Sequence, residues 1–203
     1  GMGKLIKKKF PGTRVIGIEL NRHAAEHARQ HLDLVICEDI NTLDLAAHIG
    51  STRIDTVLLL DVLEHLYDPW KALVRVRGWL DEHARVLASV PNIRNLANLD
   101  QLAAGHWTYG PDGVLDITHI RFFTRESLRQ LFEETGYVVN HMTPLTQPQW
   151  LERLVVERQP GHIVTHHMTI RYRDFDELED LYALQYVIDA RVAPAVQEDG
   201  SSR

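Results

Sequence analysis

Short apolar runs alternate with amphipathic segments from residue 14 to about residue 135. The run at Ile54–Leu60 lacks polar alternation at its centre and is followed at once by Asp61, which is typical of a strand buried on both faces of a parallel sheet. Asp68 and Pro69 form a helix-start signature, with an N-cap acceptor and a proline at the first helical position. This stretch therefore predicts a core strand, a polar turn and a helix that begins at Pro69.

The remaining elements follow from the same patterns. Asn21 and Thr124 are expected to cap the helices that follow them; Thr124 should form no capping box with Ser127, and Pro144 should interrupt the chain after a strand. The alternation of strands and helices predicts βαβ units and a parallel sheet. Strands are expected at Arg14–Leu20, Leu32–Ile36, Arg85–Val90, Tyr137–Met142, His167–Arg171 and Tyr182–Val192, and helices at Leu5–Phe10, Arg22–His31, Thr42–Ile49, Pro69–Leu80, Leu96–Ala104, Ser127–Thr135, Trp150–Val156 and Phe175–Leu181.

Length and composition suit one domain over residues 1–203, with a disordered tail after Pro194. Hydrophobic residues make up 44% of the chain, enough for a core. The net charge of −6 offers no broad basic surface to a nucleic acid, and no apolar stretch reaches membrane-spanning length. Cys37 is the single cysteine, so an intrachain disulfide is impossible and a reducing cytoplasm is the expected compartment.

Three successive strands each end at an acid: Glu19, Asp39 and Asp61. Because the carboxyl ends of parallel strands lie along one edge of a sheet, these carboxylates should point into one cleft. A carboxylate after the second strand of a nucleotide-binding unit accepts hydrogen bonds from ribose hydroxyls. The pattern therefore predicts an adenosine ligand, although acids at strand ends are also ordinary solvated loop residues.

A histidine cluster at His162, His166 and His167 invites a metal site. Adjacent histidines on a strand point to opposite faces, so the pair does not easily bind one ion, and no carboxylate stands at ligand spacing nearby. We expect no metal site.

Several motifs together resemble the class I S-adenosylmethionine-dependent methyltransferases. They are RVIGIELN, LVICEDI, IDTVLLLDVLEHLYDPWKAL, ARVLASVPN, THIRFFTRESLRQLFEETGY and ALQYVIDA, in this order along almost the whole chain. The resemblance is close to enzymes that methylate small molecules, some of them in sugar and cell-surface polysaccharide pathways. It implies a Rossmann-like α/β fold with a doubly wound, mostly parallel sheet and an antiparallel C-terminal strand.

The resemblance also implies S-adenosylmethionine as cofactor and gives roles to particular residues. Glu19 would bind the ribose hydroxyls, and Asp39 with Ile40 would bind adenine. Asp61 would lie beside the methionine portion and the acceptor. Gly3 occupies a position that is often glycine at the end of the family's Gly-rich loop.

The family's first strand and the paired glycines of its Gly-rich loop have no counterpart in GMGKLIKKKFPG. That strand normally lies between the strands that end at Glu19 and Asp61, so we expect two sheet edges with unpaired backbone groups. A mis-assigned start codon, direct pairing across the gap, or a strand from another chain in a homo-oligomer would each resolve this.

The turn after Asp61 and the aromatic loop His106–Arg121 supply candidates for the methyl acceptor's site. His65 is the first candidate for a general base, and His119 and Tyr109 are the next. Trp107 and Arg121 are candidates for binding the acceptor, Arg121 through an anionic group. For each of them a purely structural role, in a helix cap or a loop buttress, is the alternative.

The leading hypothesis is methyl transfer from S-adenosylmethionine to a small molecule, such as a sugar or a polysaccharide precursor. The alternative is a truncated or degenerate protein that binds no cofactor and is stabilised by self-association. A third interpretation, an NAD-dependent oxidoreductase on the same kind of sheet, would use Glu19 in the same way, and the THIRFFT stretch disfavours it.

Overall fold

The computed structural model describes residues 1–147 and 161–194. It divides into two compact units, Gly1–Arg53 and Ile54–Arg203. The helix expected at Trp150–Val156 and the tail after Pro194 lie outside the described residues. No helix in the described part of the chain is both long and apolar enough to cross a bilayer.

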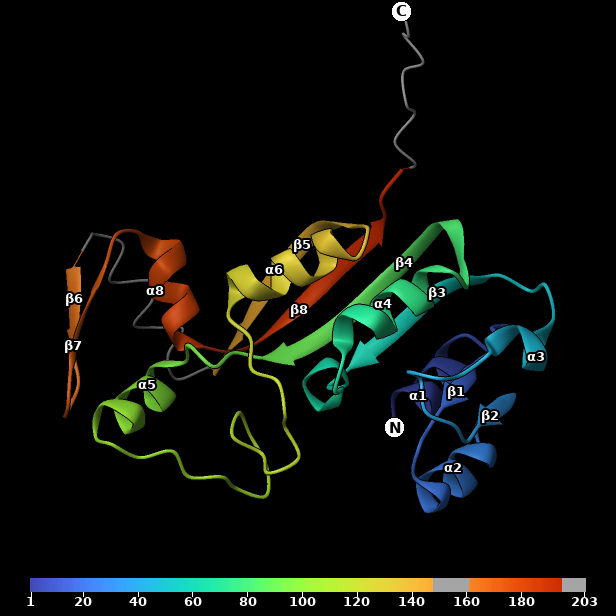
Figure 1. The fold of residues 1–203 in the computed structure, drawn as a ribbon, viewed down its shortest axis with the longest axis horizontal. Helices are drawn as coiled ribbons and strands as arrows, with labels where there is room; N and C mark the ends of the chain where they lie inside the picture. The colour runs from blue at the N-terminus through green and yellow to red at the C-terminus, as the bar shows by residue number, and fades with distance from the viewer. Residues whose placement is uncertain (148–160, 195–203) are drawn as a thin grey trace, which may run out of the picture. The chain divides into compact units, whose positions relative to one another are not determined.

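The first unit pairs two short parallel strands, β1 and β2, with helices beside them (Figure 1). Asn21 begins α2 as predicted, and its side chain accepts hydrogen bonds from the backbone N–H groups of His23 and Ala24. Lys7 reaches from α1 to the Asp33 carboxylate at 2.9 Å, which ties the first helix to the turn before β2. The elements of this unit are α1 (Met2–Lys9), β1 (Ile16–Ile18), α2 (Arg22–Arg29), β2 (Leu34–Ile36) and α3 (Leu45–Ile49).

The second unit is built on a mixed four-stranded sheet in the order β3-β4-β8-β5. β3 and β4 are parallel, whereas β8 runs antiparallel to both β4 and β5. The expected α/β fold with an antiparallel C-terminal strand is therefore confirmed. The elements here are β3 (Ile54–Leu60), η1 (Leu63–His65), α4 (Pro69–Arg77), β4 (Leu80–Pro91), α5 (Leu96–Ala103), α6 (Arg125–Glu134), β5 (Tyr137–Thr146), β6 (Gly161–Val164), β7 (Thr169–Tyr172), α8 (Phe175–Tyr182) and β8 (Ala183–Val192).

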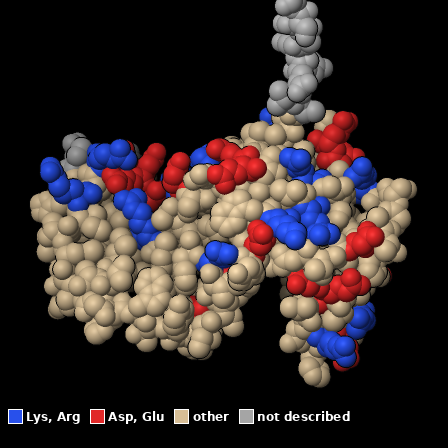
Figure 2. All heavy atoms as spheres, viewed as in Figure 1, with Lys and Arg blue, Asp and Glu red and all other residues tan. Residues whose placement is uncertain are grey.

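The core of the second unit lies between this sheet and the two helices α4 and α6, which cover one face of it (Figure 1). Tyr186, Ile188 and Ala190 alternate along β8 and are fully buried at the centre of the sheet. Tyr137 donates a hydrogen bond of 2.8 Å to the carbonyl of Leu73, so β5 is fastened to α4. Around α4 and α6, Figure 2 shows acidic and basic side chains lying next to one another.

A second, smaller core joins α5, α8 and the β6–β7 hairpin beyond one end of the sheet (Figure 1). Leu178 and Leu181 of α8 are fully buried in it, and Leu99 of α5 packs against them. The sequence analysis predicted β7 but missed β6, its partner.

Three sequence predictions in this unit are wrong in detail. Thr124 and Ser127 do form a capping box, because the Ser127 hydroxyl accepts from the Thr124 N–H in the way that a glutamate would. Pro144 does not interrupt β5; it pairs with Tyr186 on one side, and as an edge strand β5 tolerates the missing N–H. The helix expected to reach Leu80 ends at Arg77, and Leu80 begins β4 instead.

Among the described residues, β1 pairs with β2 alone and β3 pairs with β4 alone. The central residues Val57 and Leu58 of β3 are only half-buried, although their sequence is that of a fully buried strand. An open edge on each of the two sheets is therefore present, as predicted.

Candidate active site

Asp61 ends β3 in a left-handed backbone conformation, with φ of 53°. Its N–H lies 3.1 Å from both the carbonyl and the hydroxyl oxygen of Ser89 on β4. The Ser89 hydroxyl donates in turn to the Asp61 carboxylate at 3.1 Å. These contacts hold a strained residue in place at the carboxyl end of the strand, a location where backbone strain often accompanies function.

Glu64 lies in the short 3-10 turn η1 and is buried, with 1% of its surface exposed. Neither of its carboxylate oxygens has a hydrogen-bond partner among the described residues. Burial raises the pKa of Glu64 to about 7, and the nearby charge of Asp61 adds to the rise. The residue is therefore close to its titration midpoint at neutral pH, and an unpaired buried carboxyl is the kind of group that serves in a binding site.

His65 and His119 meet beside Glu64, with ring centroids 4.7 Å apart in an edge-to-face arrangement. His65 is exposed and comes from η1; His119 is buried and comes from the loop of residues 106–121. That loop is tied to η1 because the carbonyl of Glu64 accepts hydrogen bonds from the N–H groups of Ile120 and Arg121, both at 3.0 Å. Two residues that the sequence analysis named separately are thus brought together.

The hydrogen bonds of the two imidazoles indicate which ring nitrogen carries a hydrogen. Nδ1 of His119 lies 3.0 Å from the carbonyl oxygen of Val114, and Nδ1 of His65 lies 3.2 Å from the carbonyl oxygen of Thr118. A carbonyl oxygen only accepts, so in each ring Nδ1 carries the proton. In this tautomer the lone pair of each ring lies on Nε2, which can accept a proton or bind a cation.

These side chains line a cavity of about 750 Å³ in the second unit, which we call the acidic pocket. Among the described residues it has no lysine or arginine in its lining. Asp116 is held by the Thr118 hydroxyl and N–H, which lower the pKa of its carboxyl and keep it charged. The pocket therefore favours cations or neutral polar groups over anions. Its titratable lining residues are Asp61, Glu64, His65, Asp112, Asp116 and His119.

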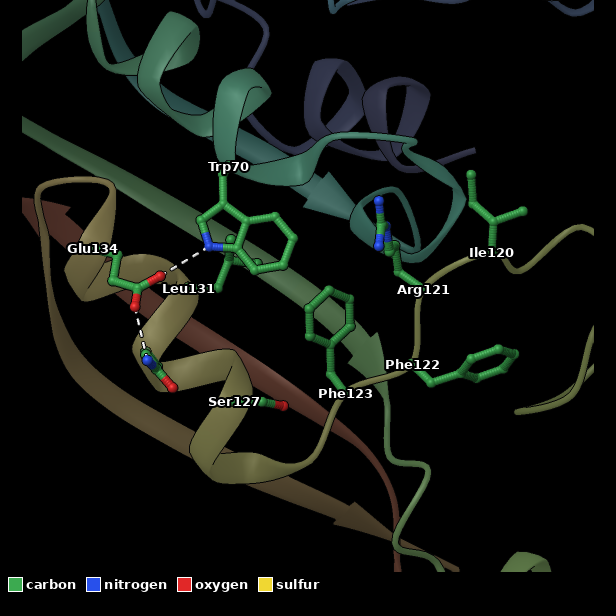
Figure 3. Close-up of a pocket in the computed structure, with 9 residues that line it drawn as sticks. Trp70, Ile120, Arg121, Phe122, Phe123, Ser127, Leu131 and Glu134 are labelled. Carbon is green, nitrogen blue, oxygen red and sulfur yellow. Dashed lines mark hydrogen bonds between the residues drawn. The ribbon is translucent and has the colours of Figure 1, made fainter.

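Arg121 faces a different, smaller cavity of about 420 Å³ beside Trp70, between α4 and α6 (Figure 3). Its guanidinium donates to the carbonyl of Tyr67, with Nε at 3.1 Å, and lies over the rings of Tyr67 and Trp70. On the far side of this cavity the Trp70 indole donates to Glu134 at 3.0 Å. Arg121 thus contacts the turn before α4, away from the acidic pocket.

Trp107 and Tyr109 also lie outside the lining of the acidic pocket. Both are exposed, and the Trp107 ring packs against Phe122 and Tyr109 at centroid distances of 5.4 and 6.5 Å. Their assignment to the acceptor stays a prediction.

In the first unit, Glu19 and Asp39 follow the neighbouring parallel strands β1 and β2. One oxygen of Glu19 accepts from the N–H of Asn21 at 2.8 Å, and one oxygen of Asp39 accepts from the N–H of Asn41 at 2.8 Å. Each carboxylate keeps its second oxygen free of any hydrogen bond to the described residues. Both are only partly buried, as is Ile40.

Gly3 lies inside α1, where a Cβ atom would approach a methyl group of Leu32 to 2.6 Å. Close packing of α1 against Leu32 is therefore sufficient to explain this glycine. Its predicted part in cofactor binding stays a prediction.

A family model described as a methyltransferase domain matches residues 2–142, more than half of the chain. The chain belongs to this family. The resemblance to class I S-adenosylmethionine-dependent methyltransferases is thereby confirmed, and S-adenosylmethionine is the cofactor that the family assignment gives. No curated protein matches the sequence.

Solved structures of other methyltransferases share the fold at low sequence identity. A SAM-dependent methyltransferase from Archaeoglobus fulgidus is 17% identical with a TM-score of 0.61, over 94% of this chain and 83% of that one. A SAM-dependent methyltransferase from Thermotoga maritima is 15% identical with a TM-score of 0.53, over 87% of this chain and 72% of that one. A third structure is the 1,6-didemethyltoxoflavin-N1-methyltransferase of Burkholderia thailandensis, solved with bound 1,6-didemethyltoxoflavin and S-adenosylhomocysteine. It is 16% identical with a TM-score of 0.52, over 90% of this chain and 63% of that one.

Sequence reasoning gave no role to Glu64, the most deeply buried titratable residue of the acidic pocket, and it did not name Asp112 or Asp116 of the same lining. Glu64 was visible only as one acid in a polar stretch after β3, between Leu63 and Leu66. Its burial results from the η1 turn, and a turn of three residues is too short to produce a periodic hydrophobic pattern in the sequence.

Proposed function

We propose that the chain transfers the methyl group of S-adenosylmethionine to a small-molecule acceptor bound in the acidic pocket. The observation that carries the proposal is the pair His65 and His119 beside a buried, unpaired Glu64, in a chain of the methyltransferase family. The cofactor supplies an electrophilic methyl group on a sulfonium centre; the residues discussed below bind, orient and deprotonate.

The cofactor's adenosine is assigned to the first unit. The free oxygens of Glu19 and Asp39 are acceptors, which suits the hydroxyl donors of a ribose and the amino donor of an adenine. Ile40 offers an apolar contact for the base, and Gly3 and Asp61 complete the predicted set. The chemistry of these residues therefore fits the cofactor.

The acceptor's proton is assigned to a histidine. Because Nδ1 is protonated in both rings, Nε2 of His119 or His65 is ready to take the proton from an acceptor hydroxyl while its oxygen takes the methyl group. The carbonyls of Val114 and Thr118 hold the rings in this tautomer. From the same loop, Tyr109 remains a further candidate for the base, and Trp107 and Arg121 remain candidates for binding the acceptor. A sugar or polysaccharide precursor is the acceptor that the resemblance suggests, and its uncharged hydroxyls are compatible with the acidic lining.

Self-association is a second proposal, and it rests on the open edge of β3. A second copy that adds a strand there would satisfy the unpaired backbone groups. If this were the chain's only role, no cofactor would bind; light scattering on the eluting protein separates a monomer from a dimer.

Calorimetry with S-adenosylhomocysteine tests the proposed function. Wild type should bind one molecule per chain, and Glu19→Gln and Asp39→Asn should each weaken binding at least about tenfold by removing charge-assisted hydrogen bonds. Glu38→Gln is the matched control, because Glu38 is exposed and its carboxylate pairs with His48, away from Glu19 and Asp39 in the hydrogen bonds of the described residues. No binding by wild type, or equal binding by all four proteins, would contradict the proposal.

A turnover assay then separates binding from chemistry. With a panel of uncharged monosaccharides and glycosides as acceptors, formation of S-adenosylhomocysteine should fall about 10²-fold or more in His119→Gln, with cofactor binding unchanged. Equal rates in His119→Gln, His65→Gln and wild type would rule out a histidine base.

A further inference from the structure

Glu64, His65 and His119 each offer one ligand atom to a common point in the acidic pocket. The three atoms lie within 4.8 Å of one another. Glu64 and His65 are neighbours in η1, whereas His119 comes from the loop of residues 106–121. Sequence spacing does not reveal this cluster, because the third member lies more than fifty residues from the other two.

The surroundings of the three groups are those of a metal site. The carbonyls of Val114 and Thr118 each accept a hydrogen bond from Nδ1 and leave Nε2 as the donor atom toward a cation. Ligating histidines in proteins nearly always have such a partner on the second ring nitrogen, since it fixes the tautomer and the orientation of the ring.

Glu64 adds an observation that is independent of the histidines. Its carboxylate is buried and lacks a hydrogen-bond partner among the described residues, an arrangement that costs free energy unless some other group satisfies it. The lining described for the pocket contains no lysine or arginine to do so, while Asp61, Asp112 and Asp116 add further negative charge. A bound cation would satisfy Glu64 and offset this charge.

We propose that Glu64, His65 and His119 bind one divalent transition-metal cation, such as Zn²⁺, Co²⁺ or Mn²⁺. Two imidazoles and one carboxylate suit such ions, whereas Mg²⁺ and Ca²⁺ prefer oxygen ligands alone. Three protein ligands leave at least one coordination position open, and it faces a cavity of about 750 Å³.

The open position deepens the proposed function, and this second step rests on that function. A hydroxyl of the acceptor that binds the cation has a lowered pKa and a fixed orientation. In the metal-bound form the two Nε2 lone pairs would be occupied, so the histidine base proposed above would act only in the metal-free chain, and a cation-bound hydroxyl would lose its proton to water instead. A sugar with neighbouring hydroxyls is the acceptor class that fits such a cation best.

Titration of the metal-free full chain with Co²⁺, without S-adenosylmethionine, tests the site. Wild type should bind one Co²⁺ per chain with the visible absorption of a nitrogen- and oxygen-ligated ion. Glu64→Gln and His119→Gln should each weaken binding at least about tenfold. His65→Gln changes an exposed residue, so this variant is expected to fold like wild type, and it should weaken Co²⁺ binding by a similar factor.

The double variant His27→Ala/His31→Ala is the matched control. Those rings lie 5.3 Å apart in the first unit and form another histidine pair that could take up Co²⁺ loosely. The control should keep the wild-type affinity and spectrum. A wild type that binds no Co²⁺ below millimolar concentration, or a folded His65→Gln variant that binds like wild type, would overturn the proposal. Binding of S-adenosylhomocysteine is measured separately. A chain that binds no Co²⁺ can therefore still bind the cofactor, and a chain that binds no cofactor can still bind Co²⁺, so the two proposals are tested independently.

Discussion

At the scale of single residues, the site depends on side chains whose type was visible in the sequence and whose environment was not. His65 could be named as a candidate because it follows the strand end at Asp61 by one turn, and His119 because it lies in the aromatic loop of residues 106–121. The sequence did not reveal that their rings meet at 4.7 Å or that Glu64 beside them is buried. The burial of Glu64 depends on a tertiary contact, because the loop of residues 106–121 packs against η1. Local sequence patterns do not predict such a contact.

Glu64 should make the metal-free protein less stable as pH rises. Its pKa in the folded chain is about 7, above the ordinary value of 4.5, so folding favours the protonated form. Below pH 4.5 the buried carboxyl is protonated and costs the folded chain no stability. The cost of ionising it grows between pH 4.5 and about pH 7, and above that pH it reaches roughly 3 kcal/mol of unfolding free energy. Glu64→Gln removes this cost. Urea unfolding in the presence of a chelator should show the variant gaining stability over wild type across that interval, and a pH-independent difference would contradict the assignment.

At the scale of elements, the sequence predicted most of the helices and strands and missed where tertiary pairing overrides local signals. Ile54–Leu60 was predicted with its bounds, because the continuous apolar run Val57–Leu60, with Asp55 before it and Asp61 after it, is a strong signal. β4 is longer than predicted because Leu80 pairs with Ile54, and β5 continues through Pro144 because it lies at a sheet edge. A single sequence does not tell an edge strand from a central one.

The capping box of α6 should contribute measurably to stability. Thr124→Ala removes the hydroxyl that accepts from the Ser127 N–H, and it should lower the free energy of unfolding by about 1 kcal/mol. Thr108→Ala, at an exposed loop position, is the control and should have little effect. Chemical unfolding followed by circular dichroism gives both values; equal stabilities of the two variants would mean that the cap is not formed.

Glu177 should stabilise α8 in a way that acid abolishes. The N–H of Arg173 and the guanidinium of Arg94 hold the pKa of its carboxyl at about 2, below the ordinary 4.5. Its contribution is therefore fully present above pH 4.5 and is lost as pH falls toward 2. Glu177→Gln should be less stable than wild type at neutral pH, and the difference should vanish on acidification, whereas Glu126→Gln at an exposed position should show no such trend. A difference that persists at low pH would contradict the ion pairs.

At the scale of the whole molecule, the family and the fold were within reach of the sequence, since DVLEHLYDP and its neighbouring motifs carry the resemblance. The shared rim of Glu19, Asp39 and Asp61 stays a prediction: the first two follow adjacent strands of one unit, and the third ends a strand of the other. The expectations of one domain over residues 1–203, of a cytoplasmic location and of a homo-oligomer also stay predictions.

A crystal structure of the chain with S-adenosylhomocysteine would test the central claim, that this chain binds the methyl donor through its strand-end acids, most directly. We predict density for the ribose hydroxyls within hydrogen-bonding distance of Glu19 and density for the adenine amino group beside Asp39. The nucleoside bound elsewhere, or absent from crystals grown at saturating ligand, would contradict the account.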